Sequence, residues 1–226
     1  MRVGVTVQFV VSPPLVRHHV AEERAHIVHQ TRFGLVDHDA CRGVVDEYGD
    51  GTVGAVRHCP VDAVEGGRPE IHDDARVSRE ATLVGDVRVD ANASVWPGVV
   101  LRGDVAPVEV GRESHVGDNA VLHAVALGDR VMVGHGAVLN ETTVDDGTLV
   151  GFNTTVNADV HVGERCIVAS GTVVPSGYDV PPESFVRGVP ARAMPLAETN
   201  IDAEAIFENY STGGYTDLAA RHEELF

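Results

Sequence analysis

The sequence contains no lysine: all 17 basic residues are arginine, against 34 acidic residues, and the formal net charge is −17. The few arginines do not form a basic stripe that could bind a phosphate backbone. This argues against nucleic acid as a partner. The three cysteines, Cys41, Cys59 and Cys166, are too few for a disulfide framework. The longest apolar run, residues 3–11, is too short to cross a membrane and lacks the flanks of a signal peptide. We therefore predict a soluble, cytoplasmic protein without a membrane partner.

The acidic excess is typical of proteins that work in concentrated salt. At molar salt the Debye length falls to about 3 Å, so crowded carboxylates repel one another weakly and still hold water. An acidic protein from an organism with a biased genome is the alternative interpretation. The halophile-type interpretation predicts that stability rises with sodium chloride.

Charge and histidine are distributed unevenly along the chain. Residues 1–60 hold 6 basic and 7 acidic residues and six of the twelve histidines, whereas residues 61–226 hold 11 basic and 27 acidic residues, a net charge of −16. The first stretch shows no sustained apolar period. It is either a histidine-rich metal-handling extension or a segment outside the native protein, whose true start then lies near Val61. We favour the second interpretation and expect residues 1–60 to be poorly structured.

From Ile71 onward an aliphatic residue recurs at almost every sixth position. A hexapeptide solenoid explains this period, whereas neither a helix nor a simple strand does. Each hexad gives a short strand with one inward aliphatic side chain and a turn that admits only a small residue, and Cys166 at such a position is expected to be a core thiol. Three hexads make one triangular coil, so residues 61–195 should form about six stacked coils. The eighteen aliphatic positions are Ile71, Val77, Leu83, Val89, Val95, Leu101, Val110, Val116, Leu122, Leu127, Val133, Leu139, Val144, Val150, Val156, Val162, Val168 and Val174.

Three steps in this series are irregular, and function is expected at such departures. Residues 101–110 contain a three-residue insertion, and two short steps of five residues are opened by His123 and Asn140. These two residues are one coil apart, so they should stack on one face at the strand spacing of about 4.8 Å. His135 belongs to a hexad on another face. One chain should therefore not bring it to His123, although a cyclic trimer can.

Four segments resemble the gamma-class carbonic anhydrase family, and the similarity runs from about Arg68 to the end of the chain. They are residues 94–104 (SVWPGVVLRGD), 121–123 (VLH), 133–136 (VGHG) and 186–191 (VRGVPA). The resemblance implies an all-β fold, a left-handed parallel β-helix followed by a C-terminal α-helix. It also implies a homotrimer with a metal at each subunit interface. Residues 196–226 fit the helical segment, because an apolar stripe at helical spacing runs through Tyr215, Leu218, Ala219, His222 and Leu225.

The resemblance also implies the ligands of a zinc or iron ion. Two of the family's three histidine ligands match His123 and His135, whereas the third position holds Asn140 in this sequence. Two imidazoles and an amide oxygen make a weaker set than three imidazoles. By the same resemblance Arg102 and Asp104 belong to the catalytic site, as part of an ion pair between subunits. A glutamine of the family's site is Gly117 here.

The other histidines of the repeat region have weaker claims to a metal. His115 lies eight residues before His123, on the rung below, and is a candidate for completing a three-histidine site. A solvent-facing or interface hydrogen bond is the other interpretation of His115. His72 and His161 are expected to be surface residues.

Three functions stay open at this point. In the first, a metal hydroxide hydrates CO₂ reversibly to bicarbonate, and Glu141, adjacent to Asn140, is a candidate for moving the proton. In the second, the protein is a non-catalytic trimeric scaffold that has kept the fold. In the third, it is a hexapeptide acyltransferase that uses His123 or His135 as general base on an acyl-coenzyme A thioester, which requires no metal.

Overall fold

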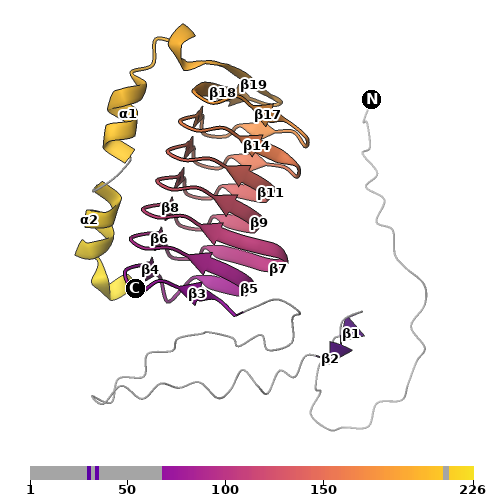
Figure 1. Ribbon diagram of the computed structural model, residues 1–226, viewed down its shortest axis with the longest axis vertical. Coiled ribbons are helices and arrows are strands. Elements are labelled where there is room, and N and C mark those ends of the chain that lie inside the picture. Colours follow the sequence, from indigo (N-terminus) through magenta and orange to yellow (C-terminus); the bar gives the residue numbers. More distant parts are fainter. Residues whose placement is uncertain (1–29, 32–33, 36–67, 211–213) are drawn as a thin grey trace, which may run out of the picture.

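The computed structural model describes residues 30–31, 34–35, 68–210 and 214–226. Strands β1 (Gln30–Thr31) and β2 (Gly34–Leu35) pair antiparallel. The rest of residues 1–60 lies outside the described residues, so the prediction made for that segment stays a prediction. The repeat region forms a parallel β-strand solenoid of about six coils, as its hexads predict (Figure 1).

The coils stack so that equivalent strands form the sides of a prism. One side consists of short parallel strands, closed by an antiparallel hairpin: β4 (Arg76–Val77), β6 (Ser94–Val95), β8 (His115–Val116), β10 (Met132–Val133), β12 (Leu149–Val150), β15 (Ile167–Val168), β18 (Ser184–Gly188) and β19 (Ala191–Pro195).

Long strands contribute to both of the other sides of the prism. The first half of each long strand lies in one side, and the second half lies in the next. The long strands are β5 (Thr82–Val89), β7 (Val100–Val110), β9 (Val121–Leu127) and β11 (Val138–Val144). Shorter strands continue these two sides: β3 (Glu70–Ile71), β13 (Thr155–Val156), β14 (Val160–Val162), β16 (Val173–Val174) and β17 (Asp179–Val180). The three-residue insertion falls within β7, where the register with β9 shifts between Arg102 and Glu109.

The predicted aliphatic positions form the core of the solenoid. From Val89 to Val174 each of them is at most 4% exposed. The column continues two hexads further than the sequence analysis took it, because Val180 and Val186 are also buried. Cys166 is fully buried, as expected, and this burial raises the pKa of its thiol to about 11.

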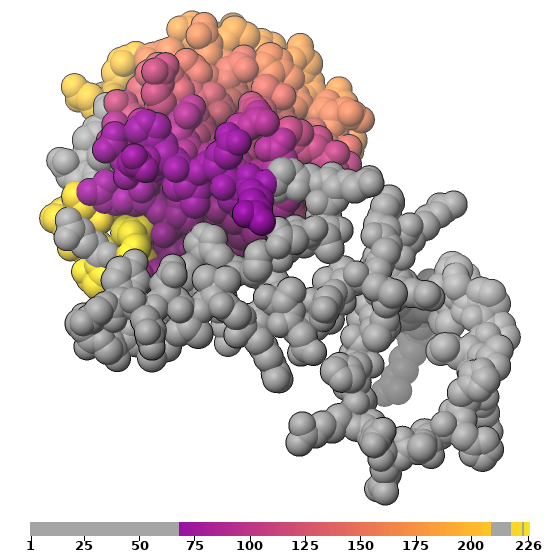
Figure 2. All heavy atoms as spheres, turned by 60° about the horizontal axis from the view of Figure 1, so that its bottom comes forward, coloured from indigo at the N-terminus to yellow at the C-terminus, as the bar shows by residue number. Residues whose placement is uncertain are grey.

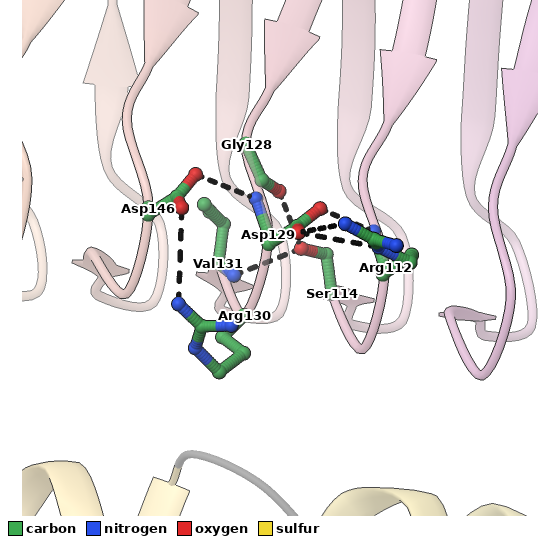
Figure 3. Close-up of polar contacts among 7 residues, drawn as sticks. All are labelled: Arg112, Ser114, Gly128, Asp129, Arg130, Val131 and Asp146. Atoms are coloured by element: carbon green, nitrogen blue, oxygen red, sulfur yellow. Dashed lines mark hydrogen bonds and ion pairs between the residues drawn. The ribbon is translucent and has the colours of Figure 1, made fainter.

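Polar side chains hold one corner of the solenoid together across successive coils (Figure 3). Asp129 Oδ1 accepts a hydrogen bond from the backbone N–H of Arg112, and Asp146 Oδ1 accepts one from the N–H of Asp129, each at 2.9 Å. The Arg112 guanidinium also donates to Asp129 Oδ2 at 3.1 Å. Gly128 leaves room for this ladder, since a Cβ there would lie 2.3 Å from Asp146 Oδ1. The carboxylates at this corner therefore pair with backbone N–H groups that the strands leave unpaired.

The predicted C-terminal helical segment is present as two short helices. The 3-10 helix Leu196–Glu198, α1 (Ala203–Tyr210), α2 (Gly214–Arg221) and the 3-10 helix Glu223–Leu225 follow the solenoid, and α1 and α2 run along one side of it (Figure 1). The rings of His222 and Phe226 meet Trp96 edge-on, with centroids 6.5 and 5.4 Å away, so the C-terminus lies against the first coils (Figure 2). No helix among the described residues is long and apolar enough to span a membrane.

Candidate metal centre

His123 and Asn140 stack on one outward face of the solenoid, as the spacing predicts. Asn140 of β11 pairs in register with His123 of β9, and His123 pairs with Arg102 of β7. The preceding residues, Leu122 and Leu139, are fully buried. Because side chains alternate along a strand, the burial of these leucines directs His123 and Asn140 outward.

A chain of polar contacts connects these residues to the insertion in β7. The Arg102 guanidinium binds Asp104 Oδ2 through Nε at 2.9 Å and Nη2 at 2.6 Å, and Asp104 Oδ1 lies 3.0 Å from His123 Nε2. Partial burial by itself raises the pKa of Asp104. The hydrogen bond and charge of Arg102, with the hydrogen bond from His123, outweigh it and lower that pKa below its usual value. Asp104 is therefore a carboxylate that accepts a hydrogen bond from the Nε2–H of the His123 ring.

The other ring nitrogen of His123 faces an oxygen. His123 Nδ1 lies 2.9 Å from Asn140 Oδ1. When Nε2 carries its hydrogen toward Asp104, the neutral imidazole has a lone pair on Nδ1, and that lone pair points at the amide oxygen. With the amide oxygen toward the ring, as in this structure, the two lone pairs repel each other unless both bind one positive centre, a proton on Nδ1 or a metal ion. The pair Nδ1 and Oδ1 thus has the form of a cation site.

The two facing atoms also suit a metal on chemical grounds. Zinc and iron accept imidazole nitrogen and amide oxygen as ligands. In this structure the two atoms lie at hydrogen-bond distance, 2.9 Å, and an ion bound by both would require them to move apart. Asp104 on the opposite ring nitrogen is the carboxylate partner that fixes the tautomer of a metal-ligating histidine. His123 and Asn140 therefore fit two positions of a coordination sphere.

His135 lies on a different side of the solenoid, in the turn after β10. Its Nδ1 is 2.7 Å from Asp118 Oδ2, and its ring stacks on Phe152 with centroids 5.1 Å apart. No group of three or more His, Cys, Asp or Glu residues that could hold a metal occurs within the described part of one chain. β9, which carries His123, and β10, which precedes His135, belong to different sheets, so the two histidines lie on different sides of the solenoid. The sequence analysis missed Asp118, whose position beside His135 follows only from the stacking of coils.

His135 also explains the glycine at position 117. A Cβ on Gly117 would lie 2.9 Å from His135 Nδ1 and 3.0 Å from the backbone oxygen of Val133. A side chain at this position would force the His135 ring to move. The departure from the resembled family at Gly117 is therefore coupled to the way His135 packs in this chain.

His115 lies in β8, on the side of the solenoid that does not carry His123. It is 2% exposed, and its Nδ1 is 2.7 Å from Ser94 Oγ, which accepts a hydrogen bond from Trp96 Nε1 at 2.8 Å. The Ser94 hydroxyl therefore joins the His115 ring to the Trp96 indole. Burial lowers the pKa of His115 to about 4. The structure places His115 in a packed hydrogen-bonded cluster, and a ligand role for it stays a prediction. His72 and His161 are half-exposed, as expected.

Two hollows lie on the His135 side. The smaller, of about 110 Å³, is lined by His115, Asp118 and His135, and the larger, of about 290 Å³, is apolar. They share the lining residues Met132, Gly134 and Phe152. An apolar hollow thus begins beside the His135–Asp118 pair.

Comparison with known proteins agrees with this architecture. The family model for the hexapeptide repeat of succinyl-transferase matches residues 107–141 and 142–176. Gamma carbonic anhydrase 1, mitochondrial, of Arabidopsis thaliana is 33% identical over 165 residues, which cover 68% of this chain and 59% of the relative. The chain belongs to the gamma carbonic anhydrase-like family of hexapeptide-repeat proteins. It spans less than two thirds of that plant relative's length.

Other hexapeptide-repeat proteins that are similar to this chain are not named as carbonic anhydrases. Carnitine operon protein CaiE of Salmonella agona (strain SL483) is 32% identical over 164 residues, covering 70% of this chain and 81% of the relative. The crystal structure of a hexapeptide transferase family protein from Anaplasma phagocytophilum matches with a TM-score of 0.61 at 28% identity, covering 68% of this chain and 92% of that one. The fold is therefore shared by proteins with carbonic anhydrase and transferase names, and the choice between these functions depends on the site.

Proposed function

We propose that this gamma carbonic anhydrase-like protein forms a trimer with a metal centre at each subunit interface, where it hydrates CO₂ reversibly to bicarbonate. His123 and Asn140 of one subunit and His135 of the partner subunit would hold a zinc or iron ion. The facing pair of His123 Nδ1 and Asn140 Oδ1, 2.9 Å apart, is the observation that carries this proposal. In this orientation of the amide both atoms can serve as ligands of one ion, and a third ligand from another subunit would complete the set.

An exposed aliphatic stripe beside the site supports the trimer. Val100, Val121 and Val138 pair in register on neighbouring strands, two residues before Arg102, His123 and Asn140, respectively, and are partly or largely exposed. Val138 is 41% exposed, and Val105 of the insertion is 72% exposed. A column of branched aliphatic side chains next to a site is a surface that a second copy of the chain would bury.

The residues of this chain have separate tasks in the proposed reaction. Arg102 holds Asp104 by two hydrogen bonds, and Asp104 accepts a hydrogen bond from the Nε2–H of His123, which leaves the Nδ1 lone pair as the ligand. A bound zinc or iron ion supplies the Lewis acidity that ionises a water molecule near neutral pH. Because Asn140 provides an amide oxygen instead of an imidazole, we expect weaker metal binding and slower hydration than a three-histidine site gives.

Metal content and oligomeric state test this proposal. Untagged protein, purified without chelators, is analysed for metal per chain and for mass in solution by light scattering, and CO₂ hydration is followed by stopped flow. We expect a trimer with up to one zinc or iron per chain, and activity that chelation removes. A metal-free trimer without hydration activity would overturn the proposal and favour the non-catalytic scaffold.

Acyl transfer is the second candidate, favoured by the pair of His135 and Asp118. A histidine 2.7 Å from a carboxylate is a suitable general base, and the apolar hollow of about 290 Å³ beside it suits an acyl group. Turnover of an acyl-coenzyme A thioester that Asp118→Asn reduces and chelation leaves unchanged would support acyl transfer. Loss of turnover on chelation would assign His135 to the metal.

A further inference from the structure

The amide of Asn140 can present either its oxygen or its nitrogen to His123. With Oδ1 toward Nδ1, the two atoms converge on a cation. With Nδ2 toward Nδ1, the amide donates a hydrogen bond to the ring, and no lone pair remains for a metal. The group that faces the far end of the amide therefore decides whether Asn140 is a ligand or a blocking donor.

That group is Glu141. Asn140 Nδ2 donates a hydrogen bond to Glu141 Oε1 at 3.1 Å. If the amide turned over, Oδ1 would face the carboxylate, and two oxygens with negative charge would repel each other. Asp104 does not favour this orientation, because it holds the hydrogen on Nε2 of His123 and so leaves Nδ1 as an acceptor.

The backbone holds Asn140 and Glu141 in place for this contact. Glu141 has φ of 48°, in the left-handed region that glycine and asparagine adopt more readily than glutamate. The Thr142 hydroxyl, on a buried residue, donates to the backbone oxygen of Asn140 at 2.9 Å. The Glu141 side chain is exposed, and its carboxylate accepts the hydrogen bond from Asn140 Nδ2.

We propose that Glu141 is a positioning residue that fixes the Asn140 amide with its oxygen toward His123 and so makes Asn140 a metal ligand. The inference rests on the proposed function, since it concerns the same centre. It gives Glu141 a role that acts through Asn140, without direct contact with metal or substrate.

A double-mutant cycle on cobalt binding tests this role. Co²⁺ affinity is measured by visible absorption in the parent, Glu141→Leu, Asn140→His and the double variant. We expect Glu141→Leu to weaken binding about 10-fold or more in the parent, the range for loss of an orienting partner. In the Asn140→His background we expect Glu141→Leu to change the Co²⁺ affinity less than twofold, because no amide remains to be oriented. Equal losses in both backgrounds, or no loss in the parent, would overturn the proposal.

Two further measurements keep the result interpretable. Glu113→Leu is the matched control, because Glu113 also has a left-handed backbone, with φ of 56°, at another turn. It should leave cobalt binding unchanged. If the parent binds no cobalt, the proposed function fails. The positioning role is then tested by NMR, from the side-chain amide resonances of Asn140 in the metal-free trimer. These resonances are assigned by their loss in Asn140→Asp. We expect Glu141→Leu to move these resonances, and unchanged resonances would reject the role.

Discussion

Asn140 Oδ1 and His123 Nδ1 face each other at 2.9 Å across neighbouring strands of one sheet. The opposite nitrogen of the same ring contacts Asp104 at 3.0 Å, so both ring nitrogens of His123 face oxygen atoms. The ring is therefore held from both sides, by a carboxylate and by an amide oxygen.

Asn140→His should raise metal affinity and CO₂ hydration. It supplies a third imidazole at the position that stacks on His123, and imidazole binds zinc or iron more tightly than an amide oxygen does. We expect a gain of at least about 10-fold in affinity, measured by competition with a chromophoric chelator. A variant that binds metal no better than the parent would show that Asn140 is not at the third ligand position.

Asp104→Asn should weaken metal binding by about 10–100-fold while the fold is retained. Asparagine keeps the shape of the side chain but loses the charge that holds the His123 Nε2 proton and the Arg102 guanidinium. Asp86→Asn is the matched control, because Asp86 also pairs with an arginine, Arg88, on the same sheet. Equal metal affinity in the Asp104 variant and this control would refute the orienting role of Asp104.

His115 should make the protein less stable in mild acid. Burial lowers its folded-state pKa to about 4, below the usual 6.5. The unfolded chain takes up a proton as the pH falls through about 6.5, whereas the folded protein takes one up only near pH 4. The stability contribution is therefore complete above pH 6.5 and is lost between pH 6.5 and 4, by about 3 kcal/mol at most.

Urea unfolding of His115→Gln at pH 7.5 and pH 5 checks this sign. Glutamine can still accept the Ser94 hydroxyl hydrogen but does not titrate, so the difference between the two pH values should shrink. His72→Gln, at a half-exposed histidine, is the control and should keep the parent's pH dependence. An unchanged pH dependence in His115→Gln would contradict the buried neutral state.

Salt should stabilise the protein, because its net charge is −17. Screening weakens repulsion among the surface carboxylates, so we expect the melting temperature to rise as sodium chloride increases from about 0.1 M to about 2 M. Differential scanning fluorimetry at constant pH measures the effect. A melting temperature that stays flat or falls would remove the halophile-type interpretation.

The period of six determined the solenoid, since an aliphatic side chain at each sixth position can be buried only if the coils stack. It also determined that His123 and Asn140 share a face, because residues one coil apart pair in register. The sequence analysis ended the series at Val174, although Val180 and Val186 keep the spacing of six and are buried. It also missed Asp118 and gave Glu141 only by adjacency.

Side-chain contacts between coils join residues 14 to 21 positions apart, and the orientation of these side chains depends on tertiary packing. Packing alone turned His115 toward Ser94 and Trp96, where the C-terminal segment covers it. The orientation of the Asn140 amide was decided by the charge of Glu141 in a left-handed turn. The sequence by itself thus determined the fold and the face that carries the site, because these follow from periodicity. Only the tertiary structure decided which atoms face one another, because hydrogen-bond direction depends on side-chain rotamers that no periodicity encodes.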